Sequence, residues 1–293
     1  MNGIHPTACI ASTVRLAGEV EIGPYVVIED HVSVGPRSVI GAHAVLKRGT
    51  SLGSENIVHE GAVIGGSPQH PLADSNVGVV HVGHGNTIRE NVTIHAAFEP
   101  GSITRVGDRN TLMVQTHVGH NCRIGHHTIL ENNTQLSPHA AVGDFAHLCE
   151  SVVIQKFCRV GSHALIVGQA HIKADVLPYV VVDGLSNCVI GLNVHSMRRL
   201  GFESVWIDRL QQAYRVIFEA GLSSESLLSE LEAGDDIRPL AELLSFLKTT
   251  PRGYVRARQI NSSRSPSVEE STPSQRSEEE AMSDQPLRIF KAA

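Results

Sequence analysis

Residues 115–128, QTHVGHNCRIGHHT, hold four histidines and one cysteine within fourteen positions. A neutral imidazole can remove a proton from a hydroxyl group near neutral pH, and imidazoles together with a thiolate can also bind zinc. Both kinds of chemistry need the acting side chains to face the same space. The positions of His117, His120, His126 and His127 in the elements that carry them therefore decide which of them can act.

A six-residue repeat surrounds this segment. Aliphatic residues stand at every sixth position in three runs, from residue 4 to 64, from 82 to 94 and from 106 to 172. Six residues suffice for a short strand and a corner but not for a pair of helices, so the period predicts a parallel β-helix with stacked coils. Cys122 and Cys158 fall at the small fifth position of their hexads, where we expect compact core residues rather than metal ligands.

Two stretches interrupt the repeat, residues 65–81 and 96–105. Each is too long for a corner, so we expect two loops that project from the coils. Ligands often bind where loops leave a rigid scaffold. These loops are therefore candidate walls of a binding site.

The hexads give way to helical spacing near Asn193. Trp206, Leu210, Tyr214 and Ile217 recur at the spacing of an amphipathic helix, and residues 236–248 predict a second helix. From residue 259 onward the chain is rich in Ser, Glu, Gln and Pro and has little to bury. We expect three parts, a β-helix over residues 1–192, a small α-helical domain over 193–258 and a disordered tail over 259–293.

Composition excludes some classes of protein. The chain has 24 basic and 30 acidic residues, and this net charge of −6 argues against general nucleic-acid binding. The first residues lack the pattern of a targeting segment, and nowhere do eighteen apolar residues run together, so we expect no stable membrane insertion. Five cysteines without a CxxC spacing do not suggest a disulfide framework. A cytoplasmic protein fits these features.

Four segments carry a resemblance to a known family: NTIRENVTIH (86–95), VGDRNTLMVQTHVGHNC (106–122), QLSPHAAVGDFA (135–146) and the stretch from PYVVVDG to NVHSMRRLGF (178–202). Over about residues 1–258 the chain resembles the acyl-[acyl-carrier-protein]:UDP-N-acetylglucosamine O-acyltransferases of lipid A biosynthesis, which are hexapeptide-repeat proteins. The resemblance implies a left-handed parallel β-helix, in which three hexads close one coil of eighteen residues. It also implies a homotrimer with its active sites between subunits.

The resemblance implies an activity as well. Enzymes of this family move an acyl chain, usually 3-hydroxylated, from acyl carrier protein to the 3-hydroxyl of UDP-N-acetylglucosamine. The phosphopantetheine thioester of the carrier protein is then a co-substrate, and neither a cofactor nor a metal is expected. A zinc site is also disfavoured by the residues themselves, because Cys122 should face inward while the neighbouring histidines face outward.

Site residues follow from the matching positions. The resemblance assigns catalytic roles to His120 and His139, substrate binding to His117, Asn193 and Arg199, and the acyl-chain groove to Gly168. Gln155 and Lys156 are expected to bind substrate as well. Coil stacking supports part of this set independently, because residue 138 lies one coil above His120 and residue 156 lies two coils above it. His126 and His127 fall at corner positions without a family role and are expected on the surface.

Four changes, two of them at residue pairs, depart from the family pattern. His70 and Leu72 replace an Asp-x-Lys pair whose lysine would touch the sugar nucleotide, Asn121 replaces the aspartate that follows the base, and Gln155 with Lys156 replaces a His-Gln pair. Pro138 replaces a glycine whose N–H would serve the oxyanion, so that donor must be another N–H such as that of His139, Lys156, or water.

These departures keep other functions open. One alternative is a hexapeptide acyltransferase that uses acyl-coenzyme A or a different amino-sugar nucleotide, such as a 3-amino analogue. Another is a catalytically weak scaffold. The sequence leaves open the acyl chain length, its 3-hydroxylation and the role of the tail.

Overall fold

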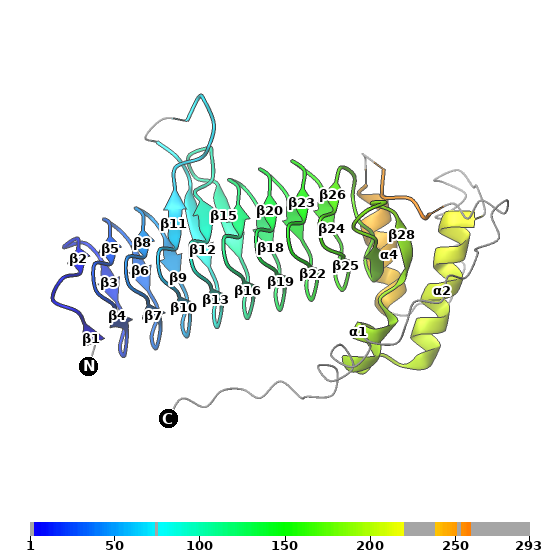
Figure 1. Cartoon of the computed structure of the whole chain (residues 1–293), viewed down its shortest axis with the longest axis horizontal. Coiled ribbons are helices and arrows are strands. Elements are labelled where there is room, and N and C mark those ends of the chain that lie inside the picture. Colours follow the sequence, from blue (N-terminus) through cyan, green and yellow to red (C-terminus); the bar gives the residue numbers. More distant parts are fainter. Residues whose placement is uncertain (1–2, 74–75, 220–237, 251–252, 259–293) are drawn as a thin grey trace, which may run out of the picture. The chain divides into compact units, whose positions relative to one another are not determined.

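A computed structural model describes residues 3–73, 76–219, 238–250 and 253–258. Its largest part is a prism of stacked coils whose three sides are sheets of short strands, and helices follow at the end of the prism where the repeat stops (Figure 1). The predicted left-handed parallel β-helix is confirmed. The predicted disordered tail, residues 259–293, lies outside the described residues.

We call the three sides sheets A, B and C. Sheet A has eleven strands, in the order β1 (Gly3–Ile4), β4 (Glu21–Ile22), β7 (Val39–Ile40), β10 (Ile57–Val58), β13 (Thr87–Ile88), β16 (Thr111–Leu112), β19 (Ile129–Leu130), β22 (His147–Leu148), β25 (Leu165–Ile166), β27 (Val180–Val182) and β28 (Val189–Leu192).

Sheets B and C are shorter. Sheet B has nine strands, in the order β2 (Cys9–Ile10), β5 (Val27–Ile28), β8 (Val45–Leu46), β11 (Val63–Gly66), β14 (Thr93–His95), β17 (His117–Val118), β20 (Gln135–Leu136), β23 (Val153–Ile154) and β26 (His171–Ile172). Sheet C has eight strands, β3 (Arg15–Leu16), β6 (Ser33–Val34), β9 (Ser51–Leu52), β12 (Val79–Val82), β15 (Ile103–Val106), β18 (Arg123–Ile124), β21 (Ala141–Val142) and β24 (Arg159–Val160).

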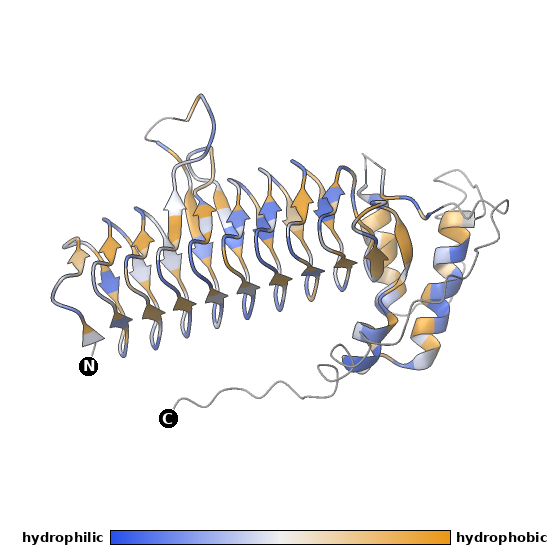
Figure 2. Cartoon of the chain, in the orientation of Figure 1, coloured by the Kyte–Doolittle hydropathy of each residue, from blue (hydrophilic) through white to orange (hydrophobic). Residues whose placement is uncertain are grey.

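The repeat explains this architecture. From β1 to β27 the strands pair in parallel from one coil to the next, and the pairs Gly3↔Glu21 and His117↔Gln135 are both eighteen residues apart. The last strand, β28, pairs with β27 in the antiparallel direction. From Ile22 onward the aliphatic residue of each hexad is buried and forms one continuous core, which also includes the buried Cys122 and Cys158, as predicted. Ile4, in the first coil, is exposed. Figure 2 shows hydrophobic residues recurring on the strands from coil to coil.

Corners need an unusual backbone. At the fourth position of most hexads a non-glycine residue has a positive φ, for example 60° at Asn121, 62° at His139 and 65° at Phe157. This conformation costs free energy for an L-residue, so packing between coils must hold it in place. Stacked rings at the corners supply such packing, as between His139 and Phe157, whose centroids lie 4.6 Å apart.

The two interruptions project as loops, and their predicted limits were wrong by a few residues. β11 extends to Gly66, β12 begins at Val79, and β15 begins at Ile103. The reason is that the loop bases pair with each other, because β12 and β15 align over four residues from Val79↔Ile103 to Val82↔Val106. The loops are thus residues 67–78, of which 74 and 75 are not described, and 96–102.

Helices α1 (Val194–Arg199), α2 (Ser204–Glu219) and α4 (Arg238–Lys248) follow the last coil. The predicted helices near 206–218 and 236–248 correspond to α2 and α4. Met197, Leu210 and Leu243 are buried, and residues 1–258 form one compact unit. A separate helical domain beginning at residue 193 stays a prediction. Among the described residues no helix has the length and apolar character needed to cross a bilayer.

Candidate functional site

His120 lies at the corner between β17 on sheet B and β18 on sheet C. Only 6% of its surface is exposed. Its ring is surrounded by other rings, with centroids 5.4 Å away at His139, 5.6 Å at Phe98 and 6.3 Å at His70. The two loops therefore close over this histidine, since residue 70 comes from one loop and residue 98 from the other.

The imidazole of His120 is held by its neighbour in sequence. His120 Nδ1 lies 2.8 Å from Asn121 Oδ1, which also accepts a hydrogen bond of 2.8 Å from the backbone N–H of Phe98. Asn121 Nδ2 donates to Glu99 Oε2 at 3.0 Å. Asn121 thus takes the place beside the imidazole where the resemblance implies an aspartate.

His139 stands one coil above the His120 corner. Burial lowers the pKa of His139, with a smaller contribution from the nearby His120, so its ring is neutral at neutral pH. Its backbone N–H donates to the carbonyl oxygen of His120 at 3.0 Å. That N–H, one of the oxyanion donors considered from sequence, is already engaged in the coil contact. Pro138 beside it has no N–H.

His117 is on the outer face of sheet B, one strand before His120. Its Nδ1 lies 2.9 Å from Thr93 Oγ1, and its ring lies 5.0 Å from that of His95. Burial first and His95 second lower the pKa of His117 to about 4. His117 is therefore neutral and can offer a hydrogen bond without charge.

Gln155 and Lys156 follow β23, two coils above the His120 corner. Gln155 Nε2 lies 3.3 Å from His171 Nε2 on sheet B. Lys156 occupies the corner position that His120 has two coils below. Both are on the same side of the prism as His120.

Asn193 and Arg199 lie at the two ends of α1, away from the His120 corner. Asn193 accepts a hydrogen bond from Ser196 N at the start of α1, and its Nδ2 donates to the carbonyl oxygen of His163 at 2.9 Å. His163 lies at the corner between β24 on sheet C and β25 on sheet A. Sheet C therefore separates this corner from the one that carries His120. A single chain does not bring the two groups of predicted site residues together.

Gly168 lies one coil above Glu150, and the carboxylate of Glu150 occupies the space into which a Cβ at residue 168 would point. The absence of a side chain at Gly168 therefore does not by itself leave open space in this chain. The role of Gly168 in an acyl-chain groove stays a prediction.

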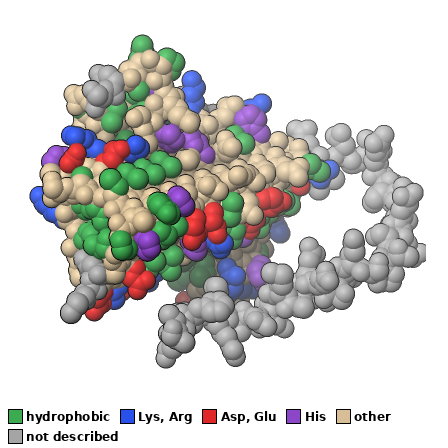
Figure 3. Space-filling view, turned by 60° about the vertical axis from the view of Figure 1, so that its left-hand side comes forward, with side chains coloured by type: hydrophobic (Ala, Val, Ile, Leu, Met, Phe, Trp, Pro, Cys, Tyr) green, Lys and Arg blue, Asp and Glu red, His purple; other side chains and the backbone are tan. Residues whose placement is uncertain are grey.

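Sheet C beside the His120 corner carries positive charge. Arg105 and Arg123 are paired in register on neighbouring strands, and together with Asn121 and His139 they line a groove. Arg159, further along, is bound to Asp175 at 2.7 Å. Arg105 and Arg123 give the groove the charge needed to attract an anionic substrate. Figure 3 shows histidine side chains gathered near the base of the projecting loop.

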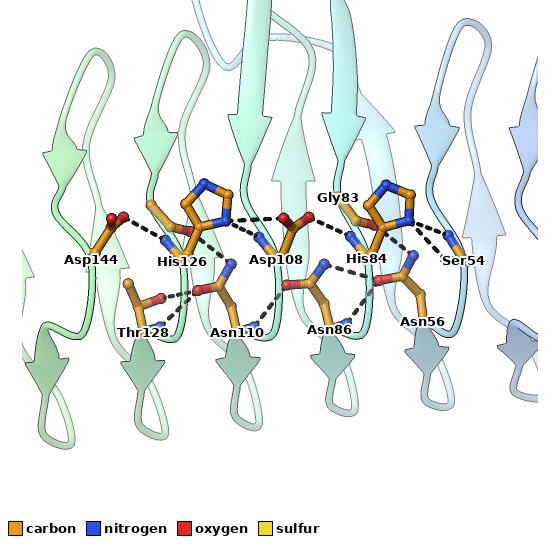
Figure 4. Close-up of polar contacts among 11 residues, drawn as sticks. Ser54, Asn56, Gly83, His84, Asn86, Asp108, Asn110, His126, Thr128 and Asp144 are labelled. Atoms are coloured by element: carbon orange, nitrogen blue, oxygen red, sulfur yellow. Dashed lines mark hydrogen bonds and ion pairs between the residues drawn. The ribbon is translucent and has the colours of Figure 1, made fainter. Parts of the chain in front are cut away.

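His126 and His127, the other two histidines of the opening segment, have structural contacts. His126 belongs to a ladder of hydrogen bonds along one corner (Figure 4). Its ring Nδ1 accepts from the backbone N–H of Asp108 at 3.0 Å, and its backbone N–H donates to Asp144 Oδ1 at 2.8 Å. The ring of His127 stacks on Phe145 with 4.8 Å between centroids. These contacts fit the predicted absence of a catalytic role.

Among the described residues, two groups of side chains could hold a metal ion, Glu131 with His147 and Cys149, and His59 with Glu60 and Glu90. Neither group includes a residue of the His120 cluster. Burial, Glu131 and Glu150 raise the pKa of Cys149 to about 11, which disfavours the thiolate that a metal needs. Cys122 faces the core, and burial raises its pKa to about 12.

Sequence reasoning missed Phe98 and Glu99. Both belong to the loop at 96–102, which was expected to project and to be a candidate wall of the site. The sequence contained no signal for their contacts with Asn121, because those contacts depend on how the loop folds back over the corner.

Comparison with known proteins adds independent information. The sequence profile described as Udp N-acetylglucosamine O-acyltransferase, Domain 2, matches residues 175–255, and the bacterial transferase hexapeptide profile matches residues 13–48. Among curated proteins, the acyl-[acyl-carrier-protein]–UDP-N-acetylglucosamine O-acyltransferase of Paraburkholderia phymatum is 38% identical, with 87% of this chain and 100% of the relative covered. The enzyme of that name from a Sulfurihydrogenibium species is 49% identical, with 85% and 93% covered.

Solved structures agree with these relatives. The UDP-N-acetylglucosamine acyltransferase of Bacteroides fragilis superposes with a TM-score of 0.84 at 32% identity, covering 86% of this chain and 100% of that structure. The corresponding enzyme of Francisella novicida also gives a TM-score of 0.84, at 29% identity, with 86% and 94% covered. The likeness therefore extends over the coils and the helices that follow them.

Proposed function

The chain belongs to the acyl-[acyl-carrier-protein]–UDP-N-acetylglucosamine O-acyltransferase family, and on this premise we propose that it transfers an acyl chain, 3-hydroxylated in the simplest case, from acyl carrier protein to the 3-hydroxyl of UDP-N-acetylglucosamine. This reaction is the first step of lipid A biosynthesis. The observation that carries the proposal is the buried His120 at a corner closed by both loops, with its Nδ1 held by Asn121.

The mechanism follows from the orientation of that imidazole. With Nδ1 bound to Asn121, Nε2 is the nitrogen left to accept the proton of the sugar hydroxyl. The oxygen then attacks the thioester carbon, and the tetrahedral intermediate collapses to an ester. The proton returns from His120 to the departing phosphopantetheine thiolate, so the residue ends the cycle as it began.

The negative charge that develops on the thioester oxygen needs a donor. Since the His139 N–H is bound to the His120 carbonyl and Pro138 has no N–H, Lys156 and water remain of the donors considered. His139, His117, Gln155 and Lys156 are placed on the same side of the prism and would contact the substrates around the reacting atoms.

The nucleotide part of the substrate would be bound by a second chain. Arg199 is suited to pair with a diphosphate, and Asn193 lies near it at the start of α1. Because these residues are at a different corner from His120, we propose that the enzyme is a homotrimer and that each site takes them from a neighbouring subunit. Arg105 and Arg123 would attract the anionic substrates, and the site would work in the cytoplasm without a cofactor or metal.

Two features favour a variant of this reaction as the second candidate. Leu72 stands where the resemblance implies a lysine for the sugar nucleotide, and the carboxylate of Glu150, one coil below, occupies the space into which a side chain at Gly168 would point. Such changes suit a hexapeptide acyltransferase that uses a different amino-sugar nucleotide or acyl-coenzyme A. The buried catalytic-type corner argues against a scaffold without activity.

The test is a substrate panel. Purified protein is incubated with acyl-carrier-protein thioesters of different lengths, with and without a 3-hydroxyl, and with acyl-coenzyme A, each against UDP-N-acetylglucosamine and a 3-amino analogue. Mass spectrometry then identifies the product. We expect an ester of UDP-N-acetylglucosamine, and His120→Ala should lower kcat by about 10²–10⁴.

His126→Ala and His127→Ala are the matched controls and should retain activity. Product only from the amino analogue, or only from acyl-coenzyme A, would replace the proposed reaction with the second candidate. No product from any pair would leave the scaffold as the better explanation.

A further inference from the structure

We propose that Glu99 is a positioning residue for the base, acting on His120 through the side-chain amide of Asn121. The structure holds a chain of three side chains, imidazole, amide and carboxylate, joined by contacts of 2.8 Å and 3.0 Å. This inference rests on the proposed function, because it assigns a role within the same site. Glu99 comes from the loop at 96–102, not from the coil that carries the base.

The amide of Asn121 has one possible orientation. The backbone N–H of Phe98 can only donate, so the atom that it meets at 2.8 Å must be the amide oxygen. The Glu99 carboxylate can only accept when ionised, so the atom that it meets must be the amide nitrogen. The oxygen that faces His120 then requires a proton on Nδ1. Phe98 and Glu99 together therefore select the imidazole tautomer whose Nε2 is free to act as a base.

The loop holds Glu99 where this contact is made. Ser102 N donates to the Glu99 carbonyl oxygen at 3.0 Å, and Ser102 Oγ also bonds that oxygen, closing a turn in which Gly101 has a φ of 78°. Ala97 accepts from Gly78 N at 2.8 Å, which ties this loop to the base of the other. These backbone contacts hold the loop in the conformation that brings the Glu99 carboxylate to Asn121.

Ionisation of Glu99 is favoured by its surroundings. A hydrogen bond from its own backbone N–H lowers the pKa of Glu99, burial opposes this, and Asn121 and His139 lower the pKa further. When His120 takes the proton of the substrate hydroxyl, its ring becomes positive. The Glu99 carboxylate polarises the Asn121 amide, and the amide oxygen then stabilises the positive ring more strongly. The proton itself stays on His120.

Asn121 and Glu99 are complementary to each other. An aspartate at position 121, as the family resemblance would place there, would bring a second carboxylate to about the 3.0 Å that separates Asn121 from Glu99. Two like charges at that distance cannot both be stable. A neutral asparagine at position 121 avoids this repulsion with Glu99. The two residues together then stabilise the protonated base as a single carboxylate beside it would.

Other groups facing His120 are the rings of His70 and His139 and, further away, His95, whose pKa is lowered mainly by burial and slightly by His120. Glu99 is thus the carboxylate that is linked, through Asn121, to His120 and the histidines around it. Removing its charge should make protonation of the base harder, so the acidic limb of the pH profile of kcat/KM should move to lower pH.

The experiment uses the full-length protein with the substrates found active in the panel. Glu99→Gln keeps a hydrogen-bonding group of the same size but removes the charge, and we expect the acidic limb to move to lower pH. Glu99→Ala also removes the hydrogen bond and should lower kcat by about 10–100-fold. Asn121→Asp should be impaired, and the double variant Asn121→Asp with Glu99→Gln should recover most of the loss.

The matched control is Glu60→Gln, which removes a carboxylate 3.8 Å from another histidine, His59, on an exposed part of the prism. Glu60→Gln should change neither the acidic limb of the pH profile of kcat/KM nor kcat itself. The proposal is overturned if Glu99→Gln leaves the acidic limb unchanged, or if the double variant is no more active than Asn121→Asp. If Glu99 had only a structural role in the loop, the effects of the substitutions at positions 99 and 121 would be independent of each other.

A second readout needs no turnover. In protein labelled with ¹⁵N-histidine, the spectrum of His120, assigned by comparison with His120→Ala, should show the tautomer protonated at Nδ1. The opposite tautomer would overturn the inference even in an active enzyme. Conversely, absence of turnover in the wild-type protein counts against the proposed function, while the tautomer still tests the contact with Asn121 and Glu99.

Discussion

Position within the coil separates the histidines that resemble each other in sequence. His120 at the corner meets both loops, whereas His126 six residues later bonds the backbone of Asp108 in the coil below. His117 is on a strand and has a neighbouring imidazole. At the scale of the residue, chemistry is therefore set by which neighbours the coil supplies.

Pro138 gives the first prediction at this scale. Replacing Pro138 by Gly adds an N–H at a position where the resemblance implies a donor to the oxyanion, so we expect kcat equal to or above that of the wild type. The added backbone freedom should lower stability by about 1 kcal/mol. Steady-state kinetics and thermal unfolding check both expectations. A large loss of kcat in a variant that remains folded would mean that the ring of Pro138 shapes the corner.

His117 predicts a pH dependence of stability. Its pKa is about 4 in the folded protein, whereas a histidine in an unfolded chain has a pKa of about 6.5. Between these values the unfolded state binds more protons, so stability should rise with pH from about 4 to about 6.5 and be lost as the pH falls through that window. His117→Gln should flatten this slope.

The measurement is the urea midpoint of unfolding between pH 4.5 and 7.5. His31→Gln, at an exposed position, is the control and should keep the wild-type slope. If His117→Gln shows the same slope as the wild type, burial of this imidazole does not govern acid stability.

At the scale of the element, an internal ladder of amides keeps the coils in register across the two loops. Asn86 N–H and Nδ2 both donate to Asn56 Oδ1 at 2.9 Å, Asn110 N donates to Asn86 Oδ1 at 2.9 Å, and Thr128 N donates to Asn110 Oδ1 at 2.7 Å (Figure 4). The steps along the chain are 30, 24 and 18 residues, so the ladder continues through both insertions.

Asn86→Ala should therefore be costly. It leaves the buried N–H of Asn110 without its acceptor, which costs about 1–3 kcal/mol, while Asn56 Oδ1 keeps only the backbone N–H of Asn86. We expect the free energy of unfolding, measured with urea, to fall by that order. Asn132→Ala, at an exposed corner, should change it little. Equal stabilities of the two variants would show that the ladder does not hold the register.

At the scale of the whole molecule, the placement of Asn193 and Arg199 at a different corner from His120 predicts association of chains. Light scattering should give three times the chain mass of 31.5 kDa at micromolar concentration. A chain ending at Arg258 should behave in the same way and keep turnover, because the composition of residues 259–293 cannot support a core. A monomer mass would contradict both the trimer and a site shared between subunits.

Arg199→Ala mixed with His120→Ala offers a sharper check of the shared site. Each variant alone should be nearly inactive, but hetero-oligomers contain sites that take both intact residues from different chains. Activity should therefore reappear on mixing after dissociation and reassociation. No recovery would place both residues in one chain's own site.

The sequence alone determined the prism. An aliphatic residue at every sixth position buries one side chain per hexad, and this local rule repeats whatever the rest of the chain does, so the coil, its core and the adjacency of His120 and His139 could be predicted. The helices near 206–218 and 236–248 were also predictable, because their apolar spacing is a local property.

Only the tertiary structure decided how the site is closed. Phe98 and Glu99 reach Asn121 across 23 and 22 residues, through a loop whose path depends on a turn at Ser102 and on pairing between the two loop bases. The same holds for the distribution of site residues over two corners, since Asn193 is fixed by a contact with His163 thirty residues away. Periodicity encodes contacts that recur between coils, but contacts made once, between loops and corners, leave no pattern in the sequence.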